Sequence, residues 1–367
     1  MIKVLEVIRQ GQIGGGESHL LDLIYFMDRT KILPICLSFT DGEMIHRLTQ
    51  MGITCYVIET QKPFDIGIQK QIIRLIKNEG IQYIHAHGSR AASNVLCTSR
   101  LLHIPLIYTV HGWSFHDDQP FLIKKIRSWS EKLICHFSSQ VICVSQSNRN
   151  TGKTTFGLKN AVVIENGVNL DRFNPESIFN DLRPEFGFSR SDCIVGFIAR
   201  CTKQKNPLVF LAALEKAHGV NSSIKGLFIG EGDMDADVDN YIEQHQMSEY
   251  LYRSSFRTDI PDILHCIDIY CLPSLWEGLS IALLEAMAMR KAIIATPTDG
   301  TCELIHDGEN GIIVPFNDVQ ALANDINTLA VSNQEIKLLG LTARKTIEKR
   351  FNAKHVADMV THIYNQL

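Results

Sequence analysis

The sequence predicts an α/β protein made of two Rossmann-like, doubly wound domains. Short apolar runs without a clean polar alternation recur along the chain, and segments with helical periodicity separate them. After a polar stretch at 170–191 that contains two prolines, the same alternation starts again. Runs of this kind are typical of strands covered on both faces, and strand–helix–strand repetition gives parallel sheets with helices on either side.

Each element follows from this alternation. In the first series we expect strands at 2–8, 33–39, 53–59, 82–87, 105–111, 140–145 and 161–165, with helices between them, for example at 17–27, 67–78, 90–102 and 121–138. In the second series we expect strands near 193–199, 224–230, 250–256, 267–273, 291–296 and 311–315. The proline-broken stretch is the expected interdomain linker. The domains are therefore predicted at 1–175 and 176–352, with a final helix at 353–367 that packs back on the first domain.

Composition narrows the class of protein. A chain of 367 residues is long enough for two domains with separate cores. The net charge of -4 provides no basic field for nucleic acid. None of the 10 cysteines forms a C-x-x-C pair, which indicates reduced thiols instead of a disulfide framework or a zinc site. The first strand lacks the apolar core of a signal peptide and no apolar run could cross a bilayer, so we expect a cytoplasmic protein.

Glycines and histidines follow the strands of the first domain. Doubly wound sheets bind ligands at the carboxyl ends of their strands. Gly14–Gly16 follow the first strand and precede a helix, where backbone N–H groups can approach an anion. His87 and His111 follow the strands at 82–87 and 105–111, and an imidazole there can bind a sugar hydroxyl or a phosphate. For His111 we favour a functional role, and for His87 a structural role at the sheet edge stays open.

The other histidines of these loops are expected to be structural. His85 and His116 are interpreted as residues that stabilise the sheet edge and its loop. His85 and His87 could suggest a metal pair, but no carboxylate partner is evident in the sequence, so zinc is not expected. The acidic run Asp233–Asp239 fails the EF-hand pattern and is explained as a helix N-terminus. We therefore predict no metal.

The loops of the second domain provide charges of both signs. Arg200 and Lys205 bracket the loop after the strand at 193–199, where two cations can stabilise a leaving diphosphate in place of a metal ion. Glu277 precedes a glycine turn and Glu285 lies on the following helix, so their carboxylates could accept hydrogen bonds from sugar hydroxyls. The alternatives are a pair of solvated surface bases and a carboxylate that favours the helix dipole.

At these residues the sequence resembles glycosyltransferase family 4, whose members are retaining enzymes with the GT-B fold. The resemblance rests on a set of segments spread over nearly the whole chain: Gly14–Glu17, Thr109–Gly112, Val144–Ser145, Glu165–Val168, Arg200 with Lys205, Gly230–Gly232, and Glu277 with Glu285 eight residues later. It implies two Rossmann-like domains that face each other across a central cleft. Asn206 and Cys201 depart from the residues that many members have at these positions.

The resemblance implies a role for each matching residue. His111, Glu277, Arg200 and Lys205 would act at the reacting centre, and the donor-binding set would be Gly15, Gly16, Arg200, Lys205, Arg257, Thr258, Glu277, Gly278, Leu279, Ser280 and Glu285. The acceptor-binding set would be Gly16, Glu17, His87 and Trp113, with the loop 112–120 shaping the pocket. The first domain would bind the acceptor and the second the donor. Retention would follow from attack on the same face, with the leaving phosphate taking the acceptor's proton.

The implied reaction uses no cofactor and moves a hexose or N-acetylhexosamine from a nucleotide sugar, with UDP favoured and GDP possible. The acceptor would be a glycan or a polyprenyl-diphosphate-linked glycan in the biosynthesis of a bacterial polysaccharide such as lipopolysaccharide or capsule. The basic amphipathic segment 121–138 would suit contact with the inner face of the plasma membrane, but an ordinary helix packed on its sheet gives the same pattern. A sugar-nucleotide epimerase, a non-catalytic sugar-nucleotide-binding subunit and, last, an NAD-linked dehydrogenase are the alternatives.

Overall fold

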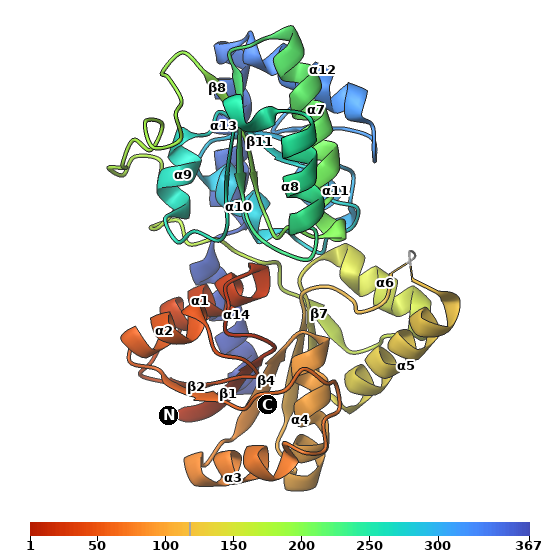
Figure 1. Cartoon of the computed structure of the whole chain (residues 1–367). Helices are drawn as coiled ribbons and strands as arrows, with labels where there is room; N and C mark the ends of the chain where they lie inside the picture. The colour runs from red at the N-terminus through yellow and green to blue at the C-terminus, as the bar shows by residue number, and fades with distance from the viewer. Residues whose placement is uncertain (117–118) are drawn as a thin grey trace. The chain divides into compact units, whose positions relative to one another are not determined.

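The computed structural model of the chain describes residues 1–116 and 119–367 (Figure 1). The chain forms two compact units. The first consists of Met1–Gly167 together with Ala353–Leu367, and the second of Val168–Asn352. The C-terminal segment thus returns to the unit in which the chain began.

The boundary between the units lies earlier than the sequence indicated. We expected the first domain to extend to residue 175, but the chain joins the second unit at Val168, whose N–H donates to the carbonyl of Phe351 at 2.9 Å. Arg344 also donates from Nη1 to the carbonyl of Phe173 at 2.7 Å. These long-range bonds fasten the segment to the second unit, although its proline-broken sequence is typical of a linker.

The first unit contains a seven-stranded sheet in the order β3-β2-β1-β4-β5-β6-β7, and all its strand pairs are parallel. Its strands are β1 (Ile2–Ile8), β2 (Ile32–Ser38), β3 (Thr54–Val57), β4 (Tyr83–His87), β5 (Leu106–Val110), β6 (Gln140–Cys143) and β7 (Ala161–Val163). The strands expected from apolar runs are therefore confirmed, with ends that differ by a few residues.

Helices cover both faces of this sheet. They are α1 (Gly15–Phe26), α2 (Glu43–Gln50), α3 (Gln69–Glu79), α4 (Ser89–Leu102), α5 (Phe121–Phe137), α6 (Gln146–Phe156) and α14 (Ala353–Gln366). The strand alternation divides the core in two: Leu5 of β1 joins one apolar cluster with residues of α3 and α4, and Val4 joins the other with residues of α1, α2 and α14. Both faces are thus buried, as the apolar strands predicted.

The second unit contains a six-stranded parallel sheet in the order β10-β9-β8-β11-β12-β13. Its strands are β8 (Cys193–Ile198), β9 (Ile224–Ile229), β10 (Leu251–Ser254), β11 (Ile269–Leu272), β12 (Ala292–Ala295) and β13 (Ile312–Ile313). Its α-helices are α7 (Pro207–Val220), α8 (Asp235–Gln244), α9 (Ile260–Cys266), α10 (Ile281–Ala288), α11 (Asp299–Leu304), α12 (Val319–Ala330) and α13 (Asn333–Arg350). Two 3₁₀ turns, η1 (Lys203–Lys205) and η2 (Met247–Glu249), complete the unit.

Each sheet has one point at which the strand order reverses. In the first unit it lies between β1 and β4, and in the second between β8 and β11. Since neighbouring strands are parallel, the loops that leave their carboxyl ends emerge at one edge and diverge there, which opens space for a ligand. These are the loops in which the sequence placed its candidate residues.

Candidate functional site

In the second unit, Lys205 and Glu277 form an ion pair at the reversal point of the sheet. Lys205 ends η1 after β8, and Glu277 lies in the loop between β11 and α10. The Lys205 ammonium contacts Glu277 Oε1, and Ser274 Oγ donates to the same oxygen at 2.7 Å. The side chains of Lys205 and Glu277 are only 12% and 7% exposed, so the two charges are largely desolvated and depend on each other.

Gln204 connects the two loops that carry this pair. The side-chain Nε2 of Gln204 donates to the backbone carbonyl of Trp276 at 2.8 Å. The backbone carbonyl of Gln204 accepts from the N–H of Leu275 at 2.8 Å. The same Nε2 lies 3.5 Å from the second carboxylate oxygen of Glu277. Sequence reasoning missed Gln204 and Ser274. The available signal was their position next to the selected residues, in loops at neighbouring strand ends.

Gly278, Leu279 and Ser280 follow the ion pair directly and lead into α10. The helix begins at Ile281, and Ser280 makes no side-chain cap to it. A Cβ added at Gly300 would lie 1.2 Å from the carbonyl oxygen of Gly278, so this loop packs directly on the backbone at Gly300. The position of the α10 N-terminus therefore depends on a glycine in the first turn of α11.

Glu285 lies one turn into α10 and is half-buried. It lies close enough to Tyr270 to affect its titration: burial raises the pKa of Tyr270 first, and the negative charges of Glu285 and Glu277 raise it further. The Tyr270 hydroxyl donates to the carbonyl of Ile198 at 2.8 Å, which ties β11 to the end of β8. Two carboxylates, one ammonium and one uncapped helix start thus gather at this edge.

In the first unit, the carboxylate of Glu6 organises a buried polar network. His87 Nε2 donates to Glu6 Oε2 at 2.9 Å, and the Tyr364 hydroxyl donates to Glu6 Oε1 at 2.8 Å. His85 lies 3.3 Å away through Nδ1 and also contacts the Tyr364 hydroxyl and Thr109 Oγ1. Although burial raises the pKa of Glu6, the adjacent imidazoles bring it below its usual range. The carboxylate is therefore ionised and holds His87 in one orientation.

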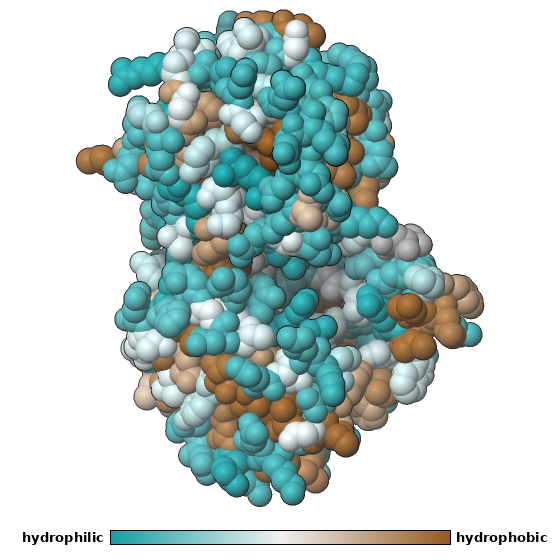
Figure 2. All heavy atoms as spheres, in the orientation of Figure 1, coloured by the Kyte–Doolittle hydropathy of each residue, from teal (hydrophilic) through white to brown (hydrophobic). Residues whose placement is uncertain are grey.

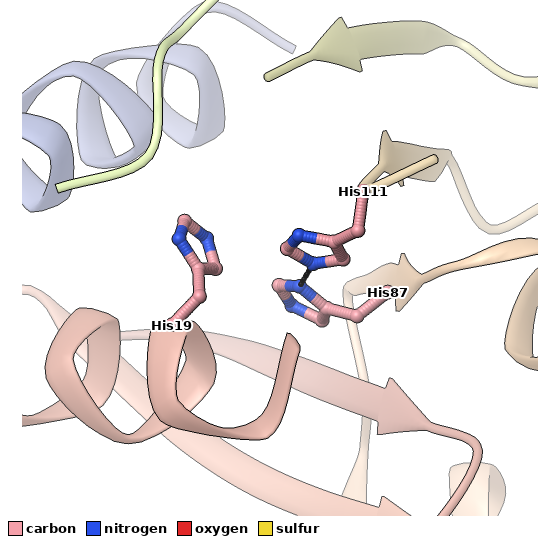
Figure 3. Close-up of side chains that lie close together, drawn as sticks. All are labelled: His19, His87 and His111. Carbon is pink, nitrogen blue, oxygen red and sulfur yellow. Dashed lines mark hydrogen bonds between the residues drawn. The ribbon is translucent and has the colours of Figure 1, made fainter. Parts of the chain in front are cut away.

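His111 and His19 complete this network at the strand ends (Figure 3). His111 Nε2 lies 3.3 Å from His87 Nδ1, and a Cβ at Gly16 would be 3.6 Å from the His111 ring. The His19 ring, on α1, faces His111 edge-on with centroids 4.9 Å apart. Burial and the neighbouring imidazoles lower the pKa of His111 well below its ordinary value. His19 and Glu6 were not selected from the sequence, because neither lies in a loop after a strand.

Two family models match this chain. The one described as Glycosyltransferase Family 4 matches residues 13–172, and the one described as Glycosyl transferases group 1 matches residues 179–346. Together they cover most of both units. The chain is a family 4 glycosyltransferase.

Named relatives of this glycosyltransferase align over most of its length. An Escherichia coli protein named UDP-Gal:alpha-D-GlcNAc-diphosphoundecaprenol alpha-1,3-galactosyltransferase is 27% identical over 80% of this chain and 77% of its own. The phosphatidyl-myo-inositol mannosyltransferase of Mycobacterium leprae is 24% identical over 82% of this chain and 78% of its own. The crystal structure of Anabaena HepE with UDP and glucose matches with a TM-score of 0.88 and 22% identity over 100% of both chains. That structural likeness shows the GT-B fold.

The other expected donor residues of this glycosyltransferase have different environments. Arg200, at the end of β8, is exposed and makes no side-chain hydrogen bond or ion pair with any residue that the structure describes. Arg257 is held by the carboxylates of Glu185 and Asp259, and these bonds raise its pKa. Thr258 is exposed, and its backbone carbonyl accepts a long hydrogen bond of 3.4 Å from Arg172. A donor contact from the Arg257 side chain would thus have to compete with two carboxylates.

The acceptor residues expected in the first unit have different environments. Gly15 and Gly16 open α1, and Glu17 is buried in its first turn. Trp113 is 6% exposed and belongs to the apolar core, and its indole N–H donates to the carbonyl of Asn148 at 2.8 Å. The side chain of Trp113 therefore has its one polar atom already bound, and its role in the structure is packing.

The structure corrects one expectation about the histidines of the first unit and describes only part of the expected acceptor loop. We expected no carboxylate beside the pair His85 and His87, but Glu6 provides one, because β1 lies next to β4 in the sheet. A carboxylate on a neighbouring strand cannot be seen in the local sequence. The loop 112–120, expected to shape the acceptor pocket, includes residues 117 and 118, which lie outside the described residues.

Proposed function

We propose that this glycosyltransferase moves a hexose or N-acetylhexosamine from UDP to the hydroxyl of a glycan or polyprenyl-diphosphate-linked acceptor, with retention of anomeric configuration and without a metal ion. Its place would be in bacterial polysaccharide biosynthesis. The observation that carries the proposal is the buried ion pair of Lys205 and Glu277 at the reversal point of the second sheet. A pair so largely desolvated is costly to keep unless its charges serve the donor.

Lys205 and the start of α10 would bind the diphosphate. An ammonium that already faces one carboxylate can add a phosphate oxygen, because it has three donor hydrogens. The N-terminus of α10 adds backbone N–H groups and the positive end of the helix dipole. Arg200 is exposed and unpaired among the described residues, so its fork can turn to the phosphates without breaking an existing bond. Two cations can then carry the charge that a metal ion would otherwise neutralise.

The two carboxylates would bind the sugars at either end of the diphosphate. Ser274 and Lys205 hold one oxygen of Glu277, and the second oxygen, which accepts a long hydrogen bond of 3.5 Å from Gln204, can also accept from the transferred sugar. Glu285 lies eight residues later, one turn into α10, and would accept hydrogen bonds from the ribose hydroxyls. Family membership supports both roles, since the two residues match the spacing that the family implies.

In the first unit, His111 would contact the transferred sugar, and Gly16, Glu17 and His87 the acceptor. The reaction breaks the bond between the anomeric carbon and the phosphate oxygen and forms one bond to the acceptor oxygen. The acceptor's proton passes to the leaving phosphate oxygen on the same face. His111 is neutral because its pKa is lowered, so it can accept a hydrogen bond from a sugar hydroxyl.

UDP is preferred for the nucleotide because the E. coli relative is named for a UDP-sugar and the HepE crystal contains UDP. The E. coli name also includes a diphosphoundecaprenol-linked acceptor, which supports a lipid-linked acceptor here. GDP-sugars remain the alternative to test.

The test is a screen of UDP- and GDP-sugars with the purified chain. Thermal stabilisation identifies the nucleotide, because a ligand that binds only the folded state raises the melting temperature. The selected donor is then incubated with and without glycan and lipid-linked acceptors, with UDP release and the anomeric NMR signal of the product as readouts. We expect acceptor-dependent release and a retained configuration. Consumption of the donor without an acceptor, with release of a free isomer, would favour the epimerase.

The variants Lys205→Ala and Glu285→Ala should abolish transfer, while Lys203→Ala, on the same turn but exposed, should keep it. Near-normal turnover of both site variants would reject the site. Stabilisation by nucleotide sugars without any turnover would instead favour a binding subunit.

Helix α5 supports a further part of this proposal, peripheral contact with a membrane that holds the acceptor. Four apolar side chains in its first half are turned to solvent: Phe121, Leu122, Ile126 and Trp129 are 80%, 67%, 59% and 65% exposed. Figure 2 shows apolar side chains gathered over this part of the first unit. None of the helices in the described residues combines the length and apolar character that a bilayer span requires.

The side of α5 that faces the sheet combines the apolar Ile134 with a carboxylate, Glu131. Glu131 is fully buried and accepts from the Tyr108 hydroxyl at 2.9 Å and from the N–H of Ser114 at 3.1 Å. Lys125 and Lys132 are exposed on the same helix. An apolar face flanked by lysines fits the interface of an anionic bilayer.

Co-sedimentation with vesicles tests this contact. We expect binding to vesicles that contain anionic phospholipid, weaker binding to zwitterionic vesicles, and loss of binding in Trp129→Glu. Val331→Glu changes a similarly exposed apolar residue in the second unit and should bind as the unchanged protein does. Equal binding by both variants would remove α5 as the contact surface.

A further inference from the structure

Three imidazoles converge on one point of the first unit from three different elements. His19 lies on α1, His87 ends β4, and His111 follows β5 (Figure 3). Their ligand nitrogens all lie within 4.8 Å of one another. The fold brings them together because α1 follows β1, and β4 is paired with β1 on one side and β5 on the other. Three histidine nitrogens on separate rigid elements are the protein ligand set of many zinc sites.

Each of the three imidazoles can offer a lone pair to a cation, because a neutral ring carries its proton on only one of its two nitrogens.

The carboxylate of Glu6 orients one of these lone pairs. His87 donates from Nε2 to Glu6, so its Nδ1 is unprotonated and faces His111 Nε2 at 3.3 Å. A carboxylate behind a histidine is the usual outer partner in metal sites, where it fixes the tautomer and makes the other nitrogen a better ligand. Tyr364 holds the second oxygen of Glu6 at 2.8 Å, so this support is rigid.

The protein alone leaves His111 incompletely bonded. Nδ1 of His111 is buried, and within residues 1–116 and 119–367 it has no hydrogen-bond partner. If His111 carries its proton on Nε2, it donates to His87 and leaves a buried lone pair at Nδ1. If the proton is on Nδ1, two lone pairs face each other at 3.3 Å. A cation between them would resolve the second arrangement, and this separation is close to the edge of about 3.4 Å that zinc–nitrogen bonds of 2.0–2.1 Å give in a tetrahedron.

The neighbouring group of Glu6, His85 and His87 does not offer such a site. Both ring nitrogens of His85 are bonded, Nδ1 to the Tyr364 hydroxyl and Nε2 to Thr109 Oγ1. Glu6 is likewise occupied by His87 and Tyr364. The ligand atoms of this group are therefore already hydrogen-bonded, whereas His111 Nδ1 in the group of three histidines has no partner among the described residues.

We propose that His19, His87 and His111 form a site for one divalent transition-metal ion of the zinc type, with a fourth coordination position open. The three protein ligands are imidazole nitrogens and include no carboxylate, which favours zinc, cobalt or nickel over magnesium or calcium. The ion is not needed for the transfer. One consequence rests on the proposed function, in which His111 contacts the transferred sugar. A bound ion would occupy the His111 ring, remove this contact and inhibit the enzyme.

Direct binding tests the site without reference to activity. The chain is freed of metal with a chelator and titrated with Zn²⁺ by calorimetry, and with Co²⁺ by visible absorption, which reports tetrahedral coordination. We expect one equivalent to bind and the cobalt bands to appear. Magnesium should not compete.

Matched variants locate the ligands. Among the described residues the His19 ring makes ring contacts with His87 and His111 and no hydrogen bond, so His19→Gln should fold normally and lose the cobalt bands. Glu6→Gln should keep a hydrogen bond to His87 and weaken zinc binding about 10- to 100-fold. His46→Gln changes an exposed histidine in the same unit and should bind as the unchanged protein does. Zinc binding that is absent, or equal in His19→Gln and His46→Gln, overturns the site.

Turnover separates this inference from the proposed function. With zinc bound at one equivalent, we expect transfer to be inhibited in the unchanged protein and restored by chelator. Binding that leaves turnover unaffected would keep the metal site and reject the role of His111 in transfer. Failure to bind zinc would reject the metal site and leave the proposed transfer unaffected.

Discussion

Removing the charge of Lys205 tests whether the ion pair with Glu277 is as buried as the structure shows. Lys205→Met keeps most of the side-chain length and leaves Glu277, only 7% exposed, without its cation. Breaking a buried pair on one side costs about 3–5 kcal/mol. Ser274 and Gln204 still hydrogen-bond the carboxylate, so we place the loss at the lower end, about 3 kcal/mol.

The magnitude is large enough to measure by two methods. For a unit of this size, each kcal/mol lowers the melting temperature by about 2–4 °C, so the transition of the second unit should fall by about 6–12 °C. Urea titration should give the same free energy of unfolding from the midpoint, with an unchanged slope. Transfer should fall by about 100-fold or more, because a preorganised cation is missing from the leaving group.

Two controls decide the interpretation. Glu277→Gln combined with Lys205→Met removes both charges and should recover about 1–3 kcal/mol of the stability lost, while transfer stays low. Lys31→Met breaks an ion pair with Asp28 whose side chains are 65% and 41% exposed, and it should leave the melting temperature nearly unchanged, because an exposed pair contributes little to stability. If Lys205→Met melts as the Lys31→Met variant does, the pair is solvated and the reasoning from burial is refuted.

Three further predictions concern single contacts. Gly300→Ala places a Cβ against the Gly278 carbonyl, so it should displace the start of α10 and reduce transfer with a weakened donor affinity; unchanged donor binding by calorimetry would contradict this. Tyr364→Phe removes the hydroxyl that donates to Glu6 and should destabilise the first unit by about 1–3 kcal/mol in urea; a wild-type midpoint would show that water replaces it. The pKa of His19 is lowered to about 3, so the unfolded chain takes up a proton below about pH 6.5 that the folded chain does not. The free energy of unfolding should therefore decrease as pH falls from about 6.5 towards 3, and His19→Gln should reduce this slope in urea titrations; an identical slope would contradict the burial of His19.

The amino-acid sequence by itself determined the architecture and the loops that carry the chemistry. Apolar runs that do not alternate indicate strands buried on both faces, and the core is divided on the two sides of β1 in this way. Glycines and charges that follow strands indicated the loops at Gly14–Gly16 and Glu277–Ser280. These signals are local, since strand periodicity, turn chemistry and helix starts depend on neighbouring residues.

Contacts between distant residues were decided only by the tertiary structure. Glu6 meets His87 81 positions later and Tyr364 358 positions later, because β1 pairs with β4 and α14 returns to the first unit. The pairing of Lys205 with Glu277, 72 positions apart, likewise requires β8 beside β11. Strand order is set by packing of the whole sheet, which no local pattern encodes. The outward face of α5 has the same origin: its periodicity shows which residues share a face, but only the burial of Glu131 against the sheet fixes which face is turned to solvent.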